Sequence, residues 1–120
     1  MGMDMYLFSA HSKKELESDD FWRNADLNTQ GTYNTIGEKY YSCKFWDLFS
    51  HINAVCFKGE YESGKYVPVT REVVEEMLDY STHHPDHFDS FNTVESLCEL
   101  LYHWDEIEEN GLQIFFECDW

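Results

Sequence analysis

Basic residues are scarce in this chain. Eight Lys and Arg stand against twenty-four Asp and Glu, so the formal net charge is −16 at pH 7. A protein that binds nucleic acid directly needs a basic face, and this composition therefore argues against direct nucleic-acid binding. The excess of acids also argues against attachment to an anionic membrane surface.

Long apolar runs are missing as well. No stretch of the sequence approaches the roughly 20 apolar residues that span a bilayer, and the first residues lack the basic and apolar regions of a secretory signal. Cys43, Cys56, Cys98 and Cys118 form no CxxC pair. We therefore expect reduced thiols packed as small apolar groups, with a zinc site or a disulfide as the alternatives. These absences predict a cytoplasmic protein.

The chain does contain enough apolar material for one folded unit. Its 120 residues are 42% hydrophobic and 18% aromatic, which predicts a single acidic domain over residues 1–120 rather than a disordered tail. Residues 3–9 alternate as a strand does, with Met5 and Leu7 on one face. The last segment alternates more strongly, and its inward face holds Leu112, Ile114, Phe116, Cys118 and Trp120. We expect these two strands to pair inside one sheet.

Two helices are expected in the first half. Ser12 and Glu15 have capping-box spacing, which predicts a short helix from Lys13. Apolar residues recur at helical spacing over residues 43–56, with Ser42 as the predicted cap and Val55 among the inward positions. An irregular hairpin is predicted over residues 61–69, with its turn at Ser63-Gly64.

Two further helices are expected in the second half. One begins at the cap Thr70, and the other runs from the cap Asn92 to Asn110-Gly111, with Cys98 and Trp104 facing inward. The predicted fold is therefore α+β. A small antiparallel sheet that includes both terminal strands carries three or four helices packed on it.

The acids are concentrated in the second half of the chain. Residues 1–30 hold six acids and three bases, residues 31–70 hold four of each, and residues 71–120 hold fourteen acids and the single base Arg71. The last fifty residues therefore carry −13 of the total charge of −16. Ten of these acids are predicted on the outer faces of the last two helices: Glu72, Glu75, Glu76, Asp79, Glu95, Glu99, Asp105, Glu106, Glu108 and Glu109.

This arrangement has a physical disadvantage. Carboxylates three or four positions apart on a helix lie about 5–6 Å from each other, which is comparable to the step between phosphates along one DNA strand. Such like charges repel, and the C-terminal turn of a helix disfavours acids such as Asp105, Glu108 and Glu109, which crowd the predicted end of the last helix. We therefore expect this acidic surface to bind a basic site on another protein. The alternative is a solvated face without a dedicated partner.

One motif offers a different chemistry. His83, His84, Asp86, His87 and Asp89 form the sequence HHPDHFD, whose side chains are plausible ligands for a divalent metal. The alternative function is therefore a small metal-dependent enzyme that uses this loop, with His103 or a nearby acid as base. Pro85 breaks helical spacing, however, so an exposed polar loop is the simpler interpretation. A third hypothesis is an adaptor that binds a partner through its aromatic side chains.

Two resemblances add context. The opening Met1-Gly2-Met3-Asp4-Met5-Tyr6-Leu7, the segment Phe21-Trp22-Arg23-Asn24-Ala25-Asp26 and residues 66–78 resemble uncharacterised small bacterial and phage proteins with MGxDMYL and YWRKAN-like segments. That family implies a bacterial or phage origin and no catalytic residue, and the HHPDHFD loop departs from its pattern. In size and acidity alone, the chain also resembles DNA-mimic proteins of bacteria and phages. These include restriction inhibitors, anti-CRISPR proteins and a Neisseria mimic that binds the histone-like protein HU.

The leading hypothesis is a non-enzymatic protein that needs no cofactor or metal. Its ten predicted acids would stand in for DNA phosphates and occupy the DNA-binding surface of a basic bacterial protein. The candidate partners are a nucleoid protein of the HU type, a restriction or CRISPR effector, or a repressor. We expect the acidic protein itself to be a monomer or a weak dimer.

Overall fold

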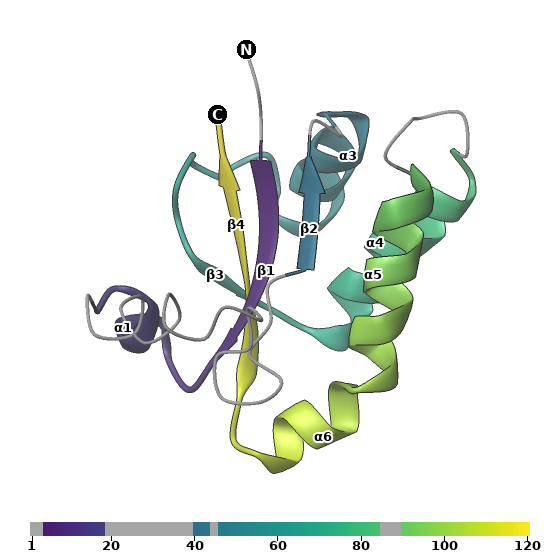
Figure 1. Ribbon diagram of the computed structural model, residues 1–120. Coiled ribbons are helices and arrows are strands. Elements are labelled where there is room, and N and C mark those ends of the chain that lie inside the picture. Colours follow the sequence, from purple (N-terminus) through teal and green to yellow (C-terminus); the bar gives the residue numbers. More distant parts are fainter. Residues whose placement is uncertain (1–3, 19–39, 44–45, 85–89) are drawn as a thin grey trace.

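The computed structural model describes residues 4–18, 40–43, 46–84 and 90–120. At its centre is an antiparallel sheet with the strand order β2-β1-β4-β3 (Figure 1). The strands are β1 (Asp4–Ala10), β2 (Tyr40–Cys43), β3 (Val67–Val69) and β4 (Gln113–Asp119). β1 and β4 pair along their whole length in the middle of the sheet, which confirms the predicted pairing of the terminal strands and the α+β class.

Four helices cover one face of this sheet (Figure 1). They are α3 (Trp46–Cys56), α4 (Arg71–Thr82), α5 (Ser90–Tyr102) and α6 (Trp104–Glu109). All four contribute buried side chains to one core, together with Met5 and Leu7 of β1 and Ile114 and Phe116 of β4. Within the described ranges, no helix has the length and apolar character needed to cross a membrane.

The opposite face of the sheet is also partly covered. Phe8 and Ala10 of β1 and Phe115 of β4 form a second buried cluster with Leu16 of the short helix α1 (Lys13–Leu16). The Ser12 hydroxyl accepts a hydrogen bond of 3.2 Å from the backbone N–H of Glu15, which confirms the predicted cap of α1. The central strands β1 and β4 are buried on both faces. Their successive side chains therefore point alternately into two apolar clusters, rather than alternately into the core and into solvent.

The second helix begins later than predicted. Residues 40–43 form β2 and pair with β1, so Ser42 lies in a strand and is not the cap of a helix. Aromatic side chains such as Tyr40 and Tyr41 favour strands, and this preference prevails over the helical spacing at Cys43. The inward position predicted for Val55 is also wrong, because its side chain is 57% exposed.

The predicted hairpin over residues 61–69 is wrong as well. Only Val67–Val69 is a strand, and its partner is β4 rather than the segment just before it. Gly64, with φ of +83°, lies in the turn, and its N–H donates a 2.8 Å hydrogen bond to the carbonyl of Cys118 in β4. β3 is an edge strand, where the missing N–H of Pro68 is tolerated.

The last predicted helix is two helices. α5 begins at Ser90, so Asn92 lies inside the helix and is not its cap. α5 ends at Tyr102, and α6 begins at Trp104. Leu97 and Leu100 of α5 and Trp104 of α6 are buried, whereas Cys98 is exposed, so the inward position predicted for Cys98 is wrong. The predicted end of the helical segment is confirmed at Asn110, which is followed by Gly111 with φ of +75°.

Candidate functional site

The solvent side of α4 carries three of the four acids predicted there. Thr70 caps the helix by accepting a 3.4 Å hydrogen bond from the N–H of Val73, as predicted. With Val74 and Met77 buried in the core, the opposite side is left to solvent. The exposed acids on α4 are Glu72, Glu75 and Asp79. Their spacing of three and four residues brings neighbours on the helix close together.

The remaining acids lie on α5 and α6. Glu95 and Glu99 are exposed on α5, and Asp105, Glu106, Glu108 and Glu109 are exposed on α6. Because α6 is a separate helix, Asp105 and Glu106 lie in its first turn. There the helix dipole favours acids. The prediction that Asp105 crowds a C-terminal helix end is therefore wrong, although it holds for Glu108 and Glu109, which precede the C-cap Asn110.

Arg71 joins the acids of α4 to those of α6. Its Nε lies 3.8 Å from a carboxylate oxygen of Glu75, and its Nη1 lies 3.8 Å from one of Asp105. It is the one Lys or Arg in residues 71–120. Both ion pairs are exposed, so they contribute little stability. They place Glu75 of α4 and Asp105 of α6, which are far apart in the sequence, beside one guanidinium.

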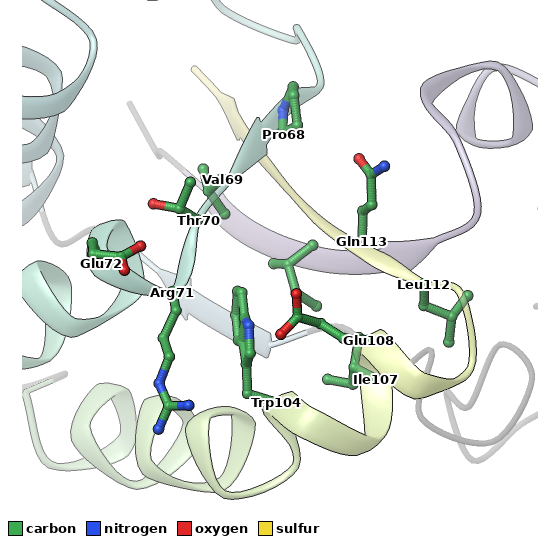
Figure 2. Close-up of a pocket in the computed structure, with 11 residues that line it drawn as sticks. Pro68, Val69, Thr70, Arg71, Glu72, Trp104, Ile107, Glu108, Leu112 and Gln113 are labelled. Atoms are coloured by element: carbon green, nitrogen blue, oxygen red, sulfur yellow. The ribbon is translucent and has the colours of Figure 1, made fainter.

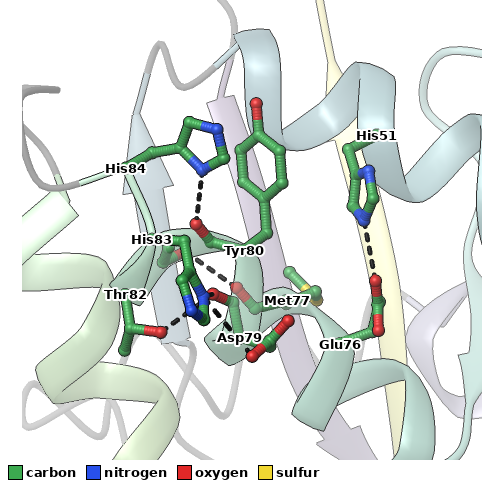
Figure 3. Close-up of polar contacts among 9 residues, drawn as sticks. His51, Glu76, Met77, Asp79, Tyr80, Thr82, His83 and His84 are labelled. Carbon is green, nitrogen blue, oxygen red and sulfur yellow. Dashed lines mark hydrogen bonds and ion pairs between the residues drawn. The ribbon is translucent and has the colours of Figure 1, made fainter.

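Glu76 departs from the predicted surface. Its carboxylate lies 2.8 Å from Nε2 of His51 on α3 (Figure 3), and the His51 ring stacks on Tyr80 with 4.6 Å between ring centroids. Glu76 therefore contacts the neighbouring helix, unlike Glu75 beside it. The prediction that Glu76 shares the outer face with the other acids of α4 needs this correction. The packing of α3 beside α4 brings Glu76 next to His51, and the sequence alone does not predict this contact.

This contact also affects a thiol. Burial raises the pKa of Cys56, and the negative charge of Glu76 raises it further. A raised pKa reduces the fraction of reactive thiolate, so Cys56 has the character of a packed thiol. Cys118 is fully buried in β4, and Cys98 is exposed on α5.

The histidine loop is only partly described. The Nδ1 atom of His83 lies 2.7 Å from the carbonyl of Asp79, and Nδ1 of His84 lies 2.8 Å from the carbonyl of Tyr80 (Figure 3). Both rings thus satisfy carbonyl groups at the C-terminal end of α4. Residues 85–89 of the HHPDHFD motif lie outside the described ranges. Among the described residues, no group of three or more His, Cys, Asp or Glu is placed to hold a metal ion.

His103, the predicted alternative base, lies between the end of α5 at Tyr102 and the start of α6 at Trp104. Its Nδ1 lies 3.4 Å from a carboxylate oxygen of Glu106 rather than near its neighbour Asp105. The pairing follows from the separate α6, which places Glu106 in its first turn. This contact joins two residues three positions apart on the surface of the protein.

Two exposed tryptophan side chains, one at the start of α3 and one at the end of the chain, lie near each other. The side chains of Trp46 and Trp120 are 40% and 46% exposed, and their ring centroids lie 6.4 Å apart. Trp120 follows the inward alternation of β4, but it lies beyond the last strand residue Asp119, with its ring near those of Phe49 and Tyr61. The helix start at Trp46 and the strand end at Trp120 meet only in the folded chain, so the sequence carries no signal for the pair.

Seven of the nine exposed acids fall into three groups, and the other two, Glu106 and Glu109, lie elsewhere on α6. Glu72, Glu75, Asp105 and Glu108 lie around Arg71 and the adjoining pocket at the α4–α6 junction. Asp79 lies at the other end of α4, where its carboxylate is 3.5 Å from His83. Glu95 and Glu99 lie on α5. No family model, curated protein or solved structure matches this chain, so its function has to be argued from these residues.

Proposed function

We propose that this chain is a non-enzymatic, DNA-mimicking binding protein. It presents the acids of α4, α5 and α6 to the DNA-binding surface of a basic bacterial protein and competes with DNA for that surface. The candidate partners are a nucleoid protein of the HU type, a restriction or CRISPR effector, or a repressor. The segment resembling YWRKAN-like proteins, residues 21–26, lies outside the described ranges and carries no part of this proposal.

One observation carries the proposal. Nine of the ten predicted acids are exposed on α4, α5 and α6, whereas residues 71–120 contain a single Lys or Arg. These helices belong to the layer that packs on one face of the sheet, so the charges lie on the side of the molecule that the helices form. Arg71 offsets only part of this charge through its contacts with Glu75 and Asp105.

The mechanism follows from electrostatics. A surface of one sign steers an oppositely charged partner and raises the association rate. Once seated, the acids occupy positions that phosphates would otherwise fill, and DNA is excluded by competition. Because exposed charges are screened over about 8 Å at physiological salt, the affinity for the partner falls as the salt concentration rises.

The test is a displacement assay. A fluorescent DNA duplex is bound to a purified HU-type nucleoid protein, a restriction endonuclease or a bacterial repressor, and fluorescence anisotropy follows its release by the acidic protein. We expect release from at least one of the three partners, at concentrations that rise between about 0.05 M and about 0.5 M NaCl. Failure to release DNA from any of them, or release that does not depend on salt, would contradict the proposal.

A matched pair of variants tests whether DNA displacement depends on the position of the acids or only on the total charge of the protein. One variant replaces Glu95, Glu99 and Glu109 by Gln, and the control replaces Glu17, Glu60 and Glu62 by Gln. All six side chains are exposed, and each variant removes the same charge. We expect the first variant to need about ten times more protein for release and the control to stay within about twofold. Equal losses would show that only net charge matters and would remove the case for a dedicated face.

A further inference from the structure

An open pocket of about 510 Å³ lies beside the acids at the α4–α6 junction (Figure 2). It is formed where β3 leads into α4, where α6 crosses below them and where β4 begins. This volume is within the range of about 300–1,000 Å³ that is usual for ligand pockets. Neither the sequence nor the proposed function accounts for it.

The floor of the pocket is apolar and rigidly held. Trp104 and Ile107 of α6 and Val69, Leu112 and Ile114 line it, and all five are buried residues of the main core. Because core side chains keep one packed arrangement, the floor is already formed without a ligand. An apolar floor of this kind favours an aliphatic or planar group over a hydrated ion.

The rim of the pocket is charged. Glu72 of α4 and Glu108 of α6 are exposed and line it, and Arg71, which precedes Glu72 in the sequence, lines it as well. The guanidinium of Arg71 extends away from Pro68 and Gln113 (Figure 2) and lies 3.8 Å from both Glu75 and Asp105. Glu75 and Asp105 therefore offset the charge of Arg71, and the carboxylates of Glu72 and Glu108 leave the pocket with an excess of negative charge.

We infer that this pocket receives an arginine side chain of the basic partner. This inference rests on the proposed function and adds an anchor to it. The aliphatic stem of an arginine covers the apolar floor, while its planar guanidinium reaches the carboxylates of Glu72 and Glu108. Lysine fits less well, because its compact ammonium ion is more strongly hydrated and lacks the forked donor geometry.

The first measurement uses a small probe. N-acetyl-arginine amide is titrated into the isotope-labelled full chain, and NMR follows the backbone amides. We expect shifts confined to residues 69–72, 104–108 and 112–114. N-acetyl-norleucine amide has the stem without the charge, and guanidinium chloride has the charge without the stem. We expect each to bind at least about fivefold more weakly than the arginine probe. Shifts spread along all three helices, or equal binding of norleucine, would overturn the inference.

The second measurement uses Glu108→Gln and the control Glu109→Gln. Both acids are exposed on α6 and carry the same charge, but only Glu108 lines the pocket. We expect Glu108→Gln to weaken probe binding about fivefold and Glu109→Gln to change probe binding by less than about twofold. Equal losses would mean that the general field of the helices acts without a pocket.

The two proposals fail in different ways. If the chain displaces DNA from a basic protein but the arginine probe does not shift the pocket residues, the pocket inference is wrong and the acidic-face proposal stands. If the probe binds in the pocket but DNA is never displaced, the proposed function is wrong, and the chemical preference of the pocket for arginine is supported.

Discussion

The hydroxyl of Tyr61 accepts a 2.7 Å hydrogen bond from the backbone N–H of Cys118 and donates one of 2.6 Å to the carbonyl of Lys65. These two bonds tie the turn before β3 to the end of β4. The ring of Tyr61 packs against Phe49, Phe57 and Phe116. One side chain thus fixes a loop to the sheet through both polar and apolar contacts.

Replacing Tyr61 by Phe keeps the packed ring and removes both hydrogen bonds. Because the N–H of Cys118 would lose this partner, we expect the free energy of unfolding to fall by about 1–3 kcal/mol. Urea denaturation followed by circular dichroism measures this change. Tyr102→Phe is the control, since Tyr102 is 85% exposed and its variant should stay within about 0.5 kcal/mol of the parent. Equal stabilities of the two variants would contradict the role assigned to Tyr61.

Alkaline pH should destabilise the protein through the same tyrosine. Burial raises the pKa of Tyr61 well above its ordinary value of 10.0, and burial also raises the pKa of Tyr66, with Glu117 and Asp119 adding to the effect. The unfolded chain therefore loses these protons at a lower pH than the folded chain. The associated stability is fully present below pH about 10 and is lost as the pH rises above it.

Unfolding in urea at a series of pH values between about 8 and 11.5 tests this expectation. The parent protein should lose stability above pH about 10, and Tyr61→Phe should lose less over the same interval, because one of the tyrosines responsible is gone. Parallel curves for the two proteins would show that Tyr61 does not contribute to the loss.

Truncation of two apolar residues of α3 should have different effects on the free energy of unfolding. Ile52 is completely buried in the core, whereas Val55 is 57% exposed. We expect Ile52→Ala to lower the free energy of unfolding by about 2–5 kcal/mol. Val55→Ala should leave it unchanged or raise it by about 0.5 kcal/mol, because alanine is the better helix former. Comparable losses in urea denaturation would mean that α3 faces the sheet differently.

The break at His103 gives two acids of α6 opposite effects on stability. Glu106 lies in the first turn of α6, where the helix dipole favours a negative charge, and Glu109 lies at its C-terminal end. At low ionic strength we expect Glu109→Gln to raise the free energy of unfolding by about 0.3–1 kcal/mol and Glu106→Gln to lower it by a similar amount.

Urea denaturation without added salt measures both variants, because urea does not screen charges as guanidinium chloride does. Salt should then reduce both differences. If a single helix continued through His103, both acids would lie near one C-terminal end, and both variants would be stabilised. That result would contradict the separate α6.

Several features of the fold are readable from short stretches of sequence. The alternation in residues 112–120, the capping residues Ser12 and Thr70, and the end of the last helix at Gly111 all follow from local physical chemistry. Backbone hydrogen-bonding groups at a helix end need a partner nearby in sequence, and glycine tolerates a positive φ. Such signals involve neighbours within a few positions, so they can be recognised without knowledge of the fold.

The acidic surface includes contacts that could not be predicted from the sequence. Composition already determined that residues 71–120 carry most of the charge, and helical spacing indicated which of these acids face away from the core. Only the tertiary structure decided that Glu76 reaches His51, that Arg71 lies between Glu75 and Asp105, and that a pocket opens beside them. Side-chain spacing along one helix is set by its own geometry. Which side chains of another helix come within a few ångströms depends instead on how both helices pack on the sheet, and that packing is a property of the whole chain.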